Sequence, residues 1–484
     1  MRWSVSLAMV GVIACFAAPF AYAQQSNSLV TVANSSQAGF NRLERLSAIA
    51  NQDVYNRLDP ICNPGGSQQP LPACGPGTAV ERTYENVREL VHTANELLGS
   101  GPTQFSLGSD AEGLGFALRW TAAEELAAPG ASSSEFANAQ LASVLSRINA
   151  LRLGASGFAV ASFGNDALGG AAAAGDSFSS RWGGFLNGSY GYGERDPSEL
   201  EDAFAFDTQD AVLGIDYRFS NAFVFGAMFG YARQTIDFDS TQSVVSGGIE
   251  SDGLSVTLYG LYEWDGPYLS LAAGMQQLSI DIKRVINYPS GYDGIPGRSD
   301  SVYATATGDT KSQTLTGSLA IGWPVALRAF GIEPSLRAEY RDIGIDAFKE
   351  TSVHNIGPDA GQPAGFDFAV GDQSITALTA SFGLKIQYSF TPSFGVLVPY
   401  AKAEMYQNLD TDPFTVSASY NGQAGGNAAF NLPSEERDDS YQVFAGGASL
   451  VLRGGWQGFV QYQYTAGIDY LSQQVISGGI RGEF

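Results

Sequence analysis

The sequence is short of charge and of long apolar segments. Only 15% of its 484 residues are charged, whereas a soluble domain carries about a quarter. Outside the N-terminus, no apolar run reaches the roughly 20 residues of a membrane-spanning helix. Helical membrane proteins are therefore excluded. A β-barrel membrane protein is not, because its alternating strands average to a neutral hydropathy.

Basic residues, histidines and cysteines are also few. The chain carries 26 Lys and Arg against 49 Asp and Glu, a net charge of −23, which argues against nucleic acid as a partner and against a basic patch for anionic lipid. Two histidines, His92 and His354, and three cysteines leave too few ligands for zinc. No acidic loop matches an EF-hand, so we predict no metal and no cofactor.

The segment "GDSF" at 175–178 is similar to the nucleophile block of GDSL-type esterases. That chemistry needs oxyanion donors downstream of the serine and a histidine base preceded by aspartate. Here "GND" at 164–166 lies upstream of Ser177, and neither His92 nor His354 has an aspartate three residues before it. The sequence therefore predicts that Ser177 is a linker serine and that the protein is not an enzyme.

Residues 1–23 have the pattern of a secretory signal peptide. Arg2 precedes an apolar stretch, and "AYA" at 21–23 forms a cleavage site before Gln24. The alternative is a lipobox, "VIAC" at 12–15, which would make Cys15 a lipidated N-terminus. Either route leads to an oxidising compartment. We therefore predict a disulfide between Cys62 and Cys74, which close a short Pro/Gly loop.

The region 24–153 follows helical spacing and predicts a small all-α domain of three or four helices. The segment 132–153 begins with serines that predict a helix cap. The segments 40–58 and 79–98 carry apolar stripes, which comprise Phe40, Leu43, Leu46, Ile49 and Val54, and Val80, Tyr84, Val87, Leu90, Val91 and Leu97. Residues 154–180 are rich in Gly and Ala and predict a flexible linker.

From Arg181 onward the sequence alternates with period two, which predicts β-strands. In "TASFGLKIQYSF", for example, Phe382, Leu384 and Ile386 alternate with Ser381 and Lys385. Twelve such runs occur, each long enough to cross a bilayer, which takes about 9–11 residues. They cover 181–195, 203–219, 222–238, 249–264, 267–286, 311–323, 328–345, 372–390, 393–408, 438–452, 455–467 and 472–484.

The connections between these runs are alternately long and tight. Tight turns such as 220–222, 265–267 and 391–393 would lie on one rim, and long loops such as 346–371 and 409–437 on the other. This arrangement is typical of an outer-membrane barrel, so we predict a mainly β fold with a twelve-stranded antiparallel transmembrane barrel at 181–484. Four tryptophans, expected on the tight-turn rim, predict an interfacial girdle: Trp182, Trp264, Trp323 and Trp456.

The chain ends in "VISGGIRGEF", in which Ile476, Ile480 and Phe484 share one side of an alternating strand. We expect this strand to close the barrel against the first. The pattern resembles the C-terminal signal by which the outer-membrane barrel assembly machinery recognises its clients. We therefore expect outer-membrane lipid and that machinery as partners.

Charged residues occupy the polar side of several predicted strands and would face the barrel lumen. Either they form a mixed-sign salt-bridge network that fills the barrel, or they contact a helix in the pore and control permeation. They are Asp216, Arg218, Glu333, Arg337, Glu339, Arg341, Lys385, Lys402 and Glu404.

The segments "WGGFLNGSYGYGERD", "GLSVTLYGLYEWDGPYLSLAAG" and "GGIRGEF" resemble the β-domain of autotransporters, the type V secretion family. The resemblance implies an N-terminal passenger and a helix that occupies the pore, for which 134–153 is the candidate. The sequence departs from the family pattern in one respect: in place of the usual long β-helical passenger, only the helical region 24–153 precedes the linker. Asn149 stands alone, without the paired asparagines of a cleavage site, so we predict that the passenger stays attached.

These features together predict an autotransporter-type translocator in the outer membrane of a Gram-negative bacterium. It would carry or display its own small helical domain, for adhesion to a surface ligand. The alternative is a porin-like or plugged channel whose helices stay in the lumen or the periplasm.

Overall fold

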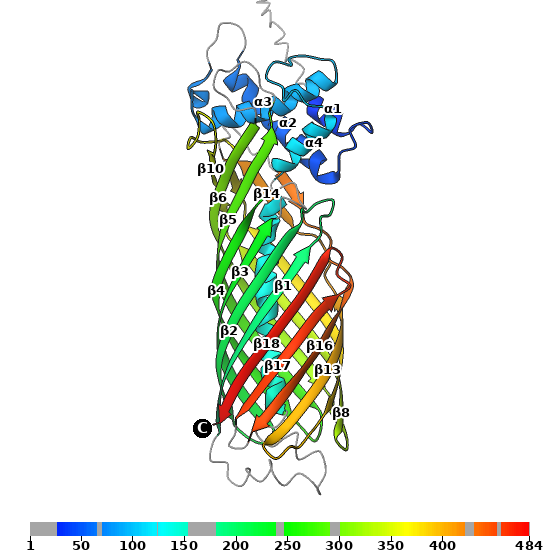
Figure 1. Ribbon diagram of the computed structural model, residues 1–484. Coiled ribbons are helices and arrows are strands. Elements are labelled where there is room, and N and C mark those ends of the chain that lie inside the picture. The colour runs from blue at the N-terminus through cyan, green and yellow to red at the C-terminus, as the bar shows by residue number, and fades with distance from the viewer. Residues whose placement is uncertain are drawn as a thin grey trace, which may run out of the picture.

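A computed structural model describes residues 27–64, 70–122, 124–152, 181–238, 246–290, 301–421, 430–452 and 456–483. It consists of an upright β-barrel with a helical domain at one end and a helix inside (Figure 1). The predicted signal peptide, the linker 154–180 with Ser177, and Phe484 lie outside the described residues.

Twelve long strands form the barrel, and each is antiparallel to both neighbours. The first, β1 (Trp182–Arg195), pairs with the last, β18 (Leu471–Glu483), and this pairing closes the wall. The prediction of a closed twelve-stranded antiparallel barrel is confirmed. The other ten strands are β2 (Phe204–Arg218), β3 (Phe223–Phe238), β4 (Ser246–Glu263), β5 (Tyr268–Pro289), β6 (Ser301–Gly322), β8 (Phe330–Ile345), β12 (Gln373–Tyr388), β13 (Gly395–Asn408), β16 (Ser440–Leu452) and β17 (Gln457–Ala466).

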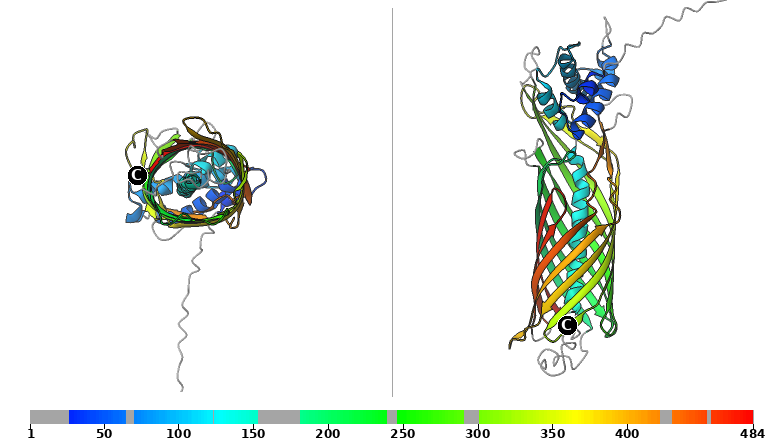
Figure 2. Two further views of the ribbon diagram at one scale, coloured as in Figure 1. Left: turned by 90° about the horizontal axis from the view of Figure 1, so that it is seen from below. Right: turned by 90° about the vertical axis from the view of Figure 1, so that its right-hand side faces the viewer.

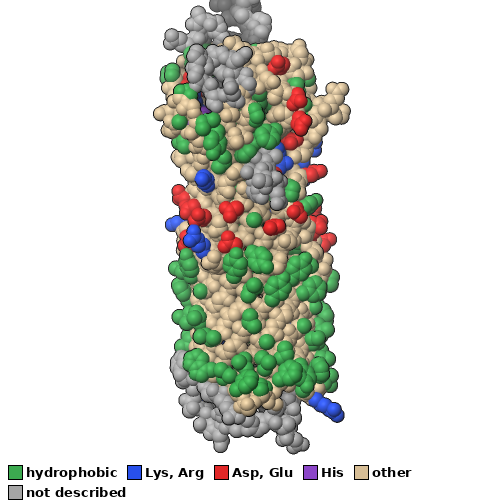
Figure 3. Space-filling view, in the orientation of Figure 1, with side chains coloured by type: hydrophobic (Ala, Val, Ile, Leu, Met, Phe, Trp, Pro, Cys, Tyr) green, Lys and Arg blue, Asp and Glu red, His purple; other side chains and the backbone are tan. Residues whose placement is uncertain are grey.

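Apolar side chains face outward from the barrel wall and polar ones face inward. On β4, Leu254 and Val256 are 49% and 52% exposed, whereas Ser255 between them is buried. On the face seen in Figure 3, apolar side chains form a band across the half of the barrel nearer the C-terminus, with charged side chains above it. The outward residues of β4 change to Glu250 and Asp252 above Leu254. The band is therefore the part of the wall suited to the hydrocarbon layer.

Two predicted strand boundaries were wrong. The stretch near 287–310 was predicted as a loop, but β5 continues to Pro289 and β6 begins at Ser301. These extensions rise above the apolar band. The residues 301–310 read "SVYATATGDT", so polar or small residues occupy both faces and the apolar alternation that marks a strand is lost.

The long loops 346–371 and 409–437 also contain strands that were not predicted. β10 (Thr351–His354) extends the barrel wall beside β6. A second sheet has the order β15-β14-β11-β9. Its strands are β9 (Phe348–Lys349), β11 (Phe368–Val370), β14 (Thr415–Tyr420) and β15 (Phe430–Pro433), and the short β7 (Val325–Leu327) precedes β8.

The helical domain lies at the long-loop end, opposite the C-terminus (Figures 1 and 2). Asn41 and Glu44 form a capping box at the start of α2, and the side chains of Thr78 and Asp110 cap α3 and α4. Its helices are α1 (Ser28–Ala33), α2 (Arg42–Cys62), α3 (Ala79–Leu97) and α4 (Ala111–Trp120), with short 3₁₀ helices η1 (Pro72–Cys74) and η2 (Glu124–Ala127).

Two residues assigned to the apolar stripes, Ile49 and Leu97, are 49% and 38% exposed, so that assignment was wrong. Each three-residue step along an α-helix falls about 60° short of a full turn. Phe40 precedes α2, and two such steps from Leu43 inside the helix place Ile49 about 120° away, on the solvent side. α4 was not predicted as a separate helix.

The helical domain and the long-loop end of the barrel share one hydrophobic core. Leu90 and Leu118 of the domain belong to the same buried cluster as Ile286 of β5 and Phe368 of the second sheet. Hydrogen bonds reinforce the contact: Thr83 Oγ1 donates to the Gly365 carbonyl at 3.0 Å, and the Tyr420 hydroxyl donates to Asn51 at 2.9 Å. The domain is thus packed onto the barrel rather than tethered to it.

Cys62 and Cys74 form the predicted disulfide, which links the end of α2 to η1. Cross-linking residues this close in sequence stabilises a fold by about 3 kcal/mol in the chain-entropy account. We expect Cys62→Ser/Cys74→Ser to lower the free energy of unfolding of the helical domain by that amount.

The measurement is chemical denaturation of the purified protein, followed by the helical circular dichroism signal. Reducing the wild-type protein should reproduce the loss, and reductant should leave the double variant unchanged. An identical midpoint for reduced and oxidised wild type would contradict the prediction.

Candidate functional site: the occupied barrel lumen

A single helix, α5 (Ala128–Arg152), runs along the barrel axis from the helical domain toward the opposite rim (Figure 2). It overlaps the pore-helix candidate 134–153 but begins earlier. The expectation that Ser132 and Ser133 cap this helix was wrong, because both lie inside it and are buried. The dipeptide "PG" at 129–130 suggests a helix break in the sequence. Proline is tolerated in the first turn of a helix, however, and Pro129 lies in the first turn of α5.

Small polar side chains join the upper part of α5 to the wall. The Ser132 hydroxyl donates to Ser251 at 3.0 Å, and the Ser133 hydroxyl donates to Ser312 at 2.8 Å. Lower down, Ser255 donates to Gln140 Oε1 at 2.6 Å. These bonds satisfy polar groups that would otherwise be buried without partners.

One glycine of the wall lies directly beside a hydrogen bond between α5 and β4. A Cβ atom at Gly230 of β3 would lie 2.6 Å from Ser255 Oγ and 2.7 Å from the Gln140 amide. Both atoms belong to the hydrogen bond just described. Gly230 therefore lets α5 lie close to the backbone of β3.

A buried ion pair anchors the lower part of α5. Arg147 Nε donates to Asp216 Oδ2 at 2.7 Å, and the Tyr259 hydroxyl donates to the same oxygen at 3.0 Å. The side chains of Arg147 and Asp216 are only 1% and 4% exposed. The Arg147 guanidinium also lies over the Phe185 ring, 4.9 Å from its centroid.

A second anchor lies at the C-terminal end of the helix. Arg152 Nη1 donates to Glu333 Oε1 at 2.6 Å, and its Nε donates to Glu263 at 3.2 Å. Glu333 also accepts from the Tyr268 hydroxyl at 3.1 Å and pairs with Lys385 Nζ at 2.9 Å. Both basic residues of α5 are thus bound to carboxylates of the wall.

Eight of the nine charges predicted to face the lumen divide into two groups. Asp216, Glu333, Arg341 and Lys385 contact α5, the last two through asparagine side chains of the helix. A second group pairs along the wall: Arg337 with Glu404 at 2.6 Å and with Glu339 at 3.2 Å, and Lys402 with Glu404 at 2.7 Å. Arg218 is half-buried at the lower end of β2.

Several residues of this site were missed by the sequence analysis: Arg147, Arg152, Tyr259 and Tyr268. The sequence does contain features that could have identified these four residues. Arg147 and Arg152 are the only basic residues of α5, and a charge on a helix inside a barrel requires a partner. Tyr259 and Tyr268 occupy lumen-facing positions of the strand alternation and are buried.

The predicted rim and closing-strand residues lie on the outer surface. The four tryptophans of the girdle are between 40% and 60% exposed, next to the rim where β1 begins and β18 ends. Ile476 and Ile480 of β18 face outward and are 46% and 57% exposed.

Within the described ranges, no helix is long and apolar enough to cross a membrane, and no three His, Cys, Asp or Glu side chains are grouped to hold a metal. His92 is buried in the helical domain, where its Nε2 lies 3.2 Å from the Tyr55 hydroxyl. Burial lowers the pKa of His92, which favours its neutral form. It is a core residue of that domain.

Removing the charge of Arg147 should weaken the hold on α5. In Arg147→Met, Asp216 keeps a buried charge without its main partner, at a cost of about 3–5 kcal/mol. We expect the helix to leave the lumen at least about 100-fold more often, and the measurement is channel conductance in planar bilayers.

Two further variants control this experiment. Arg233→Met breaks an ion pair with Glu250 whose side chains are 58% and 64% exposed, so the channel should stay closed. Arg147→Met/Asp216→Leu removes both charges of the pair and should restore part of the closure, since Arg481, 3.9 Å from Asp216, then loses this carboxylate. An Arg147→Met barrel as silent as wild type would contradict the anchoring role.

The comparisons with known proteins agree with this architecture. The family model described as the autotransporter beta-domain matches residues 184–463. The search of curated proteins found no match. Among solved structures, the chain is similar to the translocator domain of the autotransporter NalP from Neisseria meningitidis, with 15% identity, a TM-score of 0.46, and coverage of 64% of this chain and 90% of that one.

Two further autotransporter structures are similar. The beta domain of the Bordetella autotransporter BrkA has 17% identity and a TM-score of 0.41, covering 62% of this chain and 99% of that one. The transport unit of AIDA-I from Escherichia coli has 15% identity and a TM-score of 0.41, covering 70% and 97%. The assignment rests on the family match, which spans more than half of the chain and coincides with the barrel: the protein belongs to the autotransporter family of Gram-negative outer-membrane proteins.

Proposed function

We propose that this autotransporter keeps its own helical domain on the cell surface as a permanently attached passenger. The main support for this proposal is the path of α5 through the barrel. The helix joins a domain packed on the long-loop rim to the opposite rim, where β1 begins. If the long loops face outward, as is usual for outer-membrane barrels, the domain is outside the cell.

The packing of the domain supports retention. Its core is continuous with the extensions of β5 and β6 and with the second sheet. Asn86 Nδ2 donates to the Ala364 carbonyl at 2.9 Å, and Ser290 donates to Glu89 at 3.2 Å. A passenger destined for release has no need of such a docking surface, whereas a displayed one is held in a fixed orientation by it.

Adhesion is the use that we propose for the displayed domain. Ile49, Leu98 and Phe116 are 49%, 46% and 40% exposed on it, and a displayed domain would offer them to an apolar partner surface. The alternative is a porin-like or plugged channel, in which α5 would also lie in the lumen with its arginines bound to the wall, so the display test below separates the two.

The test of display is an epitope inserted between Cys62 and Cys74, probed on intact cells by antibody labelling and protease. The matched control carries the same epitope in the tight turn 391–393, between β12 and β13. We expect the first epitope to be accessible and the control to become accessible only after permeabilisation.

The reverse pattern would place the helical domain in the periplasm and overturn the proposal. Retention is tested on the same cells. The outer-membrane fraction should contain one chain that carries both the epitope and the barrel, and a fragment released into the medium would contradict attachment.

The adhesion proposal is tested with Ile49→Ser/Leu98→Ser/Phe116→Ser. Cells that display this variant at the wild-type level should aggregate less than cells that display the wild-type domain. They should therefore settle more slowly from suspension. Equal settling rates would argue against these side chains as the adhesive surface.

A further inference from the structure

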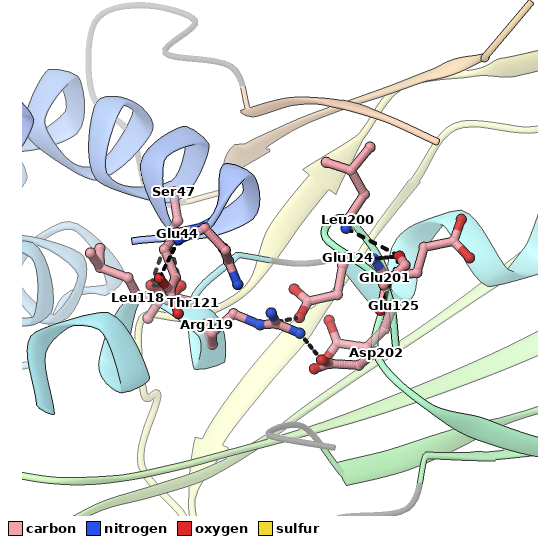
Figure 4. A network of polar contacts seen from close by, with 12 residues as sticks. Glu44, Ser47, Leu118, Arg119, Thr121, Glu124, Glu125, Leu200, Glu201 and Asp202 are labelled. Atoms are coloured by element: carbon pink, nitrogen blue, oxygen red, sulfur yellow. Dashed lines mark hydrogen bonds and ion pairs between the residues drawn. The ribbon is translucent and has the colours of Figure 1, made fainter. Parts of the chain in front are cut away.

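Six charged side chains are buried together where the helical domain meets the mouth of the barrel, and Figure 4 shows four of them: Arg119, Glu124, Glu125 and Asp202. Each is at most 7% exposed. Carboxylates outnumber guanidinium groups by two, so the cluster carries excess negative charge when all six are ionised. The carboxylates are Glu124, Glu125, Asp202 and Glu350, and the guanidinium groups are Arg119 and Arg284.

The two arginines are engaged mainly by the other carboxylates. Arg284 binds Glu350 through two hydrogen bonds of 2.8 Å and lies 3.9 Å from Glu125. Arg119 of α4 pairs with Asp202 in the loop between β1 and β2. Each strong ion pair therefore uses one arginine and one carboxylate, which leaves Glu124 and Glu125 with the weaker contacts.

Glu124 is the least compensated group of the cluster. Neither of its carboxylate oxygens has a hydrogen-bond partner among the described residues. Its nearest cation is Arg119 Nε, 3.7 Å from Oε1, and Figure 4 shows this guanidinium reaching between Glu124 and Asp202. A buried charge without adequate partners is far more costly than the neutral acid.

We propose that the junction is a proton-binding site, in which Glu124 is protonated while the helical domain is docked and in which loss of that proton loosens the docking. Burial and the neighbouring Glu125 raise the pKa of Glu124 to about 8. Burial also raises the pKa of Glu125, and Glu350 adds to this increase against the opposing effect of Arg284.

The other groups around the site do not supply the missing positive charge. Burial raises the pKa of Tyr420 of β14, which also interacts with Arg284, so Tyr420 stays neutral. Glu201, next to Asp202, is paired with Arg195 at 2.6 Å. The positive charge of Arg195 is therefore balanced by Glu201 and does not compensate Glu124.

The pH dependence follows from the direction of the pKa change. Between the ordinary pKa of glutamate and about 8, the docked state holds a proton at Glu124 that an undocked, solvated Glu124 has lost. Docking is therefore tightest in acid, weakens as pH rises through this interval, and levels off above it. The inference concerns the junction alone and does not depend on which side of the membrane the domain faces.

The test uses the purified full-length protein in detergent. The melting temperature of the helical circular dichroism signal should fall as pH is raised from about 5 to about 8. Glu124→Gln should flatten this fall and should melt at a higher temperature than wild type at the alkaline end. The matched control Glu112→Gln alters an exposed glutamate of α4 and should keep the wild-type slope.

Equal slopes for wild type and a folded Glu124→Gln would overturn the proposal. A second measurement on the wild-type protein covers the case in which that variant does not fold. Infrared spectroscopy of protein with isotope-labelled glutamate should show a protonated carboxylic acid that persists at neutral pH and disappears near pH 8. Absence of that band at pH 6 would equally overturn the proposal.

Discussion

The structure depends on one constraint: in a bilayer, the backbone groups of every strand must be hydrogen-bonded to a neighbour. The pairing of β1 with β18 meets it for the two strands that would otherwise be edges, from Gly183 opposite Glu483 to Arg195 opposite Leu471. Closure with twelve strands fixes the width of the bore. Because the inner face of the wall carries many polar side chains beside a few apolar ones, a helix that fills the bore has to offer polar partners on several sides.

α5 meets this requirement through its composition. Its serines and glutamine bond to wall hydroxyls in the upper part, and its two arginines meet carboxylates below. Its apolar residues Val144, Ile148 and Leu151 pack against wall residues in a separate cluster. Such a helix would be a poor surface helix of a soluble protein, since no single face is apolar, but it suits a surrounding wall that has both kinds of side chain.

The sequence predicts those parts of the protein in which one local pattern determines the structure. Period-two alternation identified all twelve membrane strands, because each one must present an apolar face to lipid. In residues 301–310 polar or small side chains occupy most positions on both faces, so the start of β6 at Ser301 was missed. The second sheet was missed for a related reason: its strands are two to six residues long, too short for a periodicity.

The site was predicted less well than the fold. The wall charges could be assigned to the lumen by parity alone, but their partners on α5 could not. Whether Arg147 faces Asp216 depends on the height of the helix in the bore and on its rotation, and both are set by many contacts with strands distant in sequence. The charge excess at Glu124 was equally hidden, since it arises only where α4, η2, a loop and β5 meet.

The span of the disulfide bears on how such a domain could cross the bore. One α-helix with its side chains is about 10–12 Å across, and among the described residues α5 is the helix that occupies the bore. The Cα atoms of Cys62 and Cys74 are 5.3 Å apart, close to the spacing of paired strands. A chain cross-linked over twelve residues can therefore travel as a narrow hairpin of similar cross-section, with only a short loop beyond the cross-link. Oxidation of this pair is thus compatible with either order of events, before or after transit.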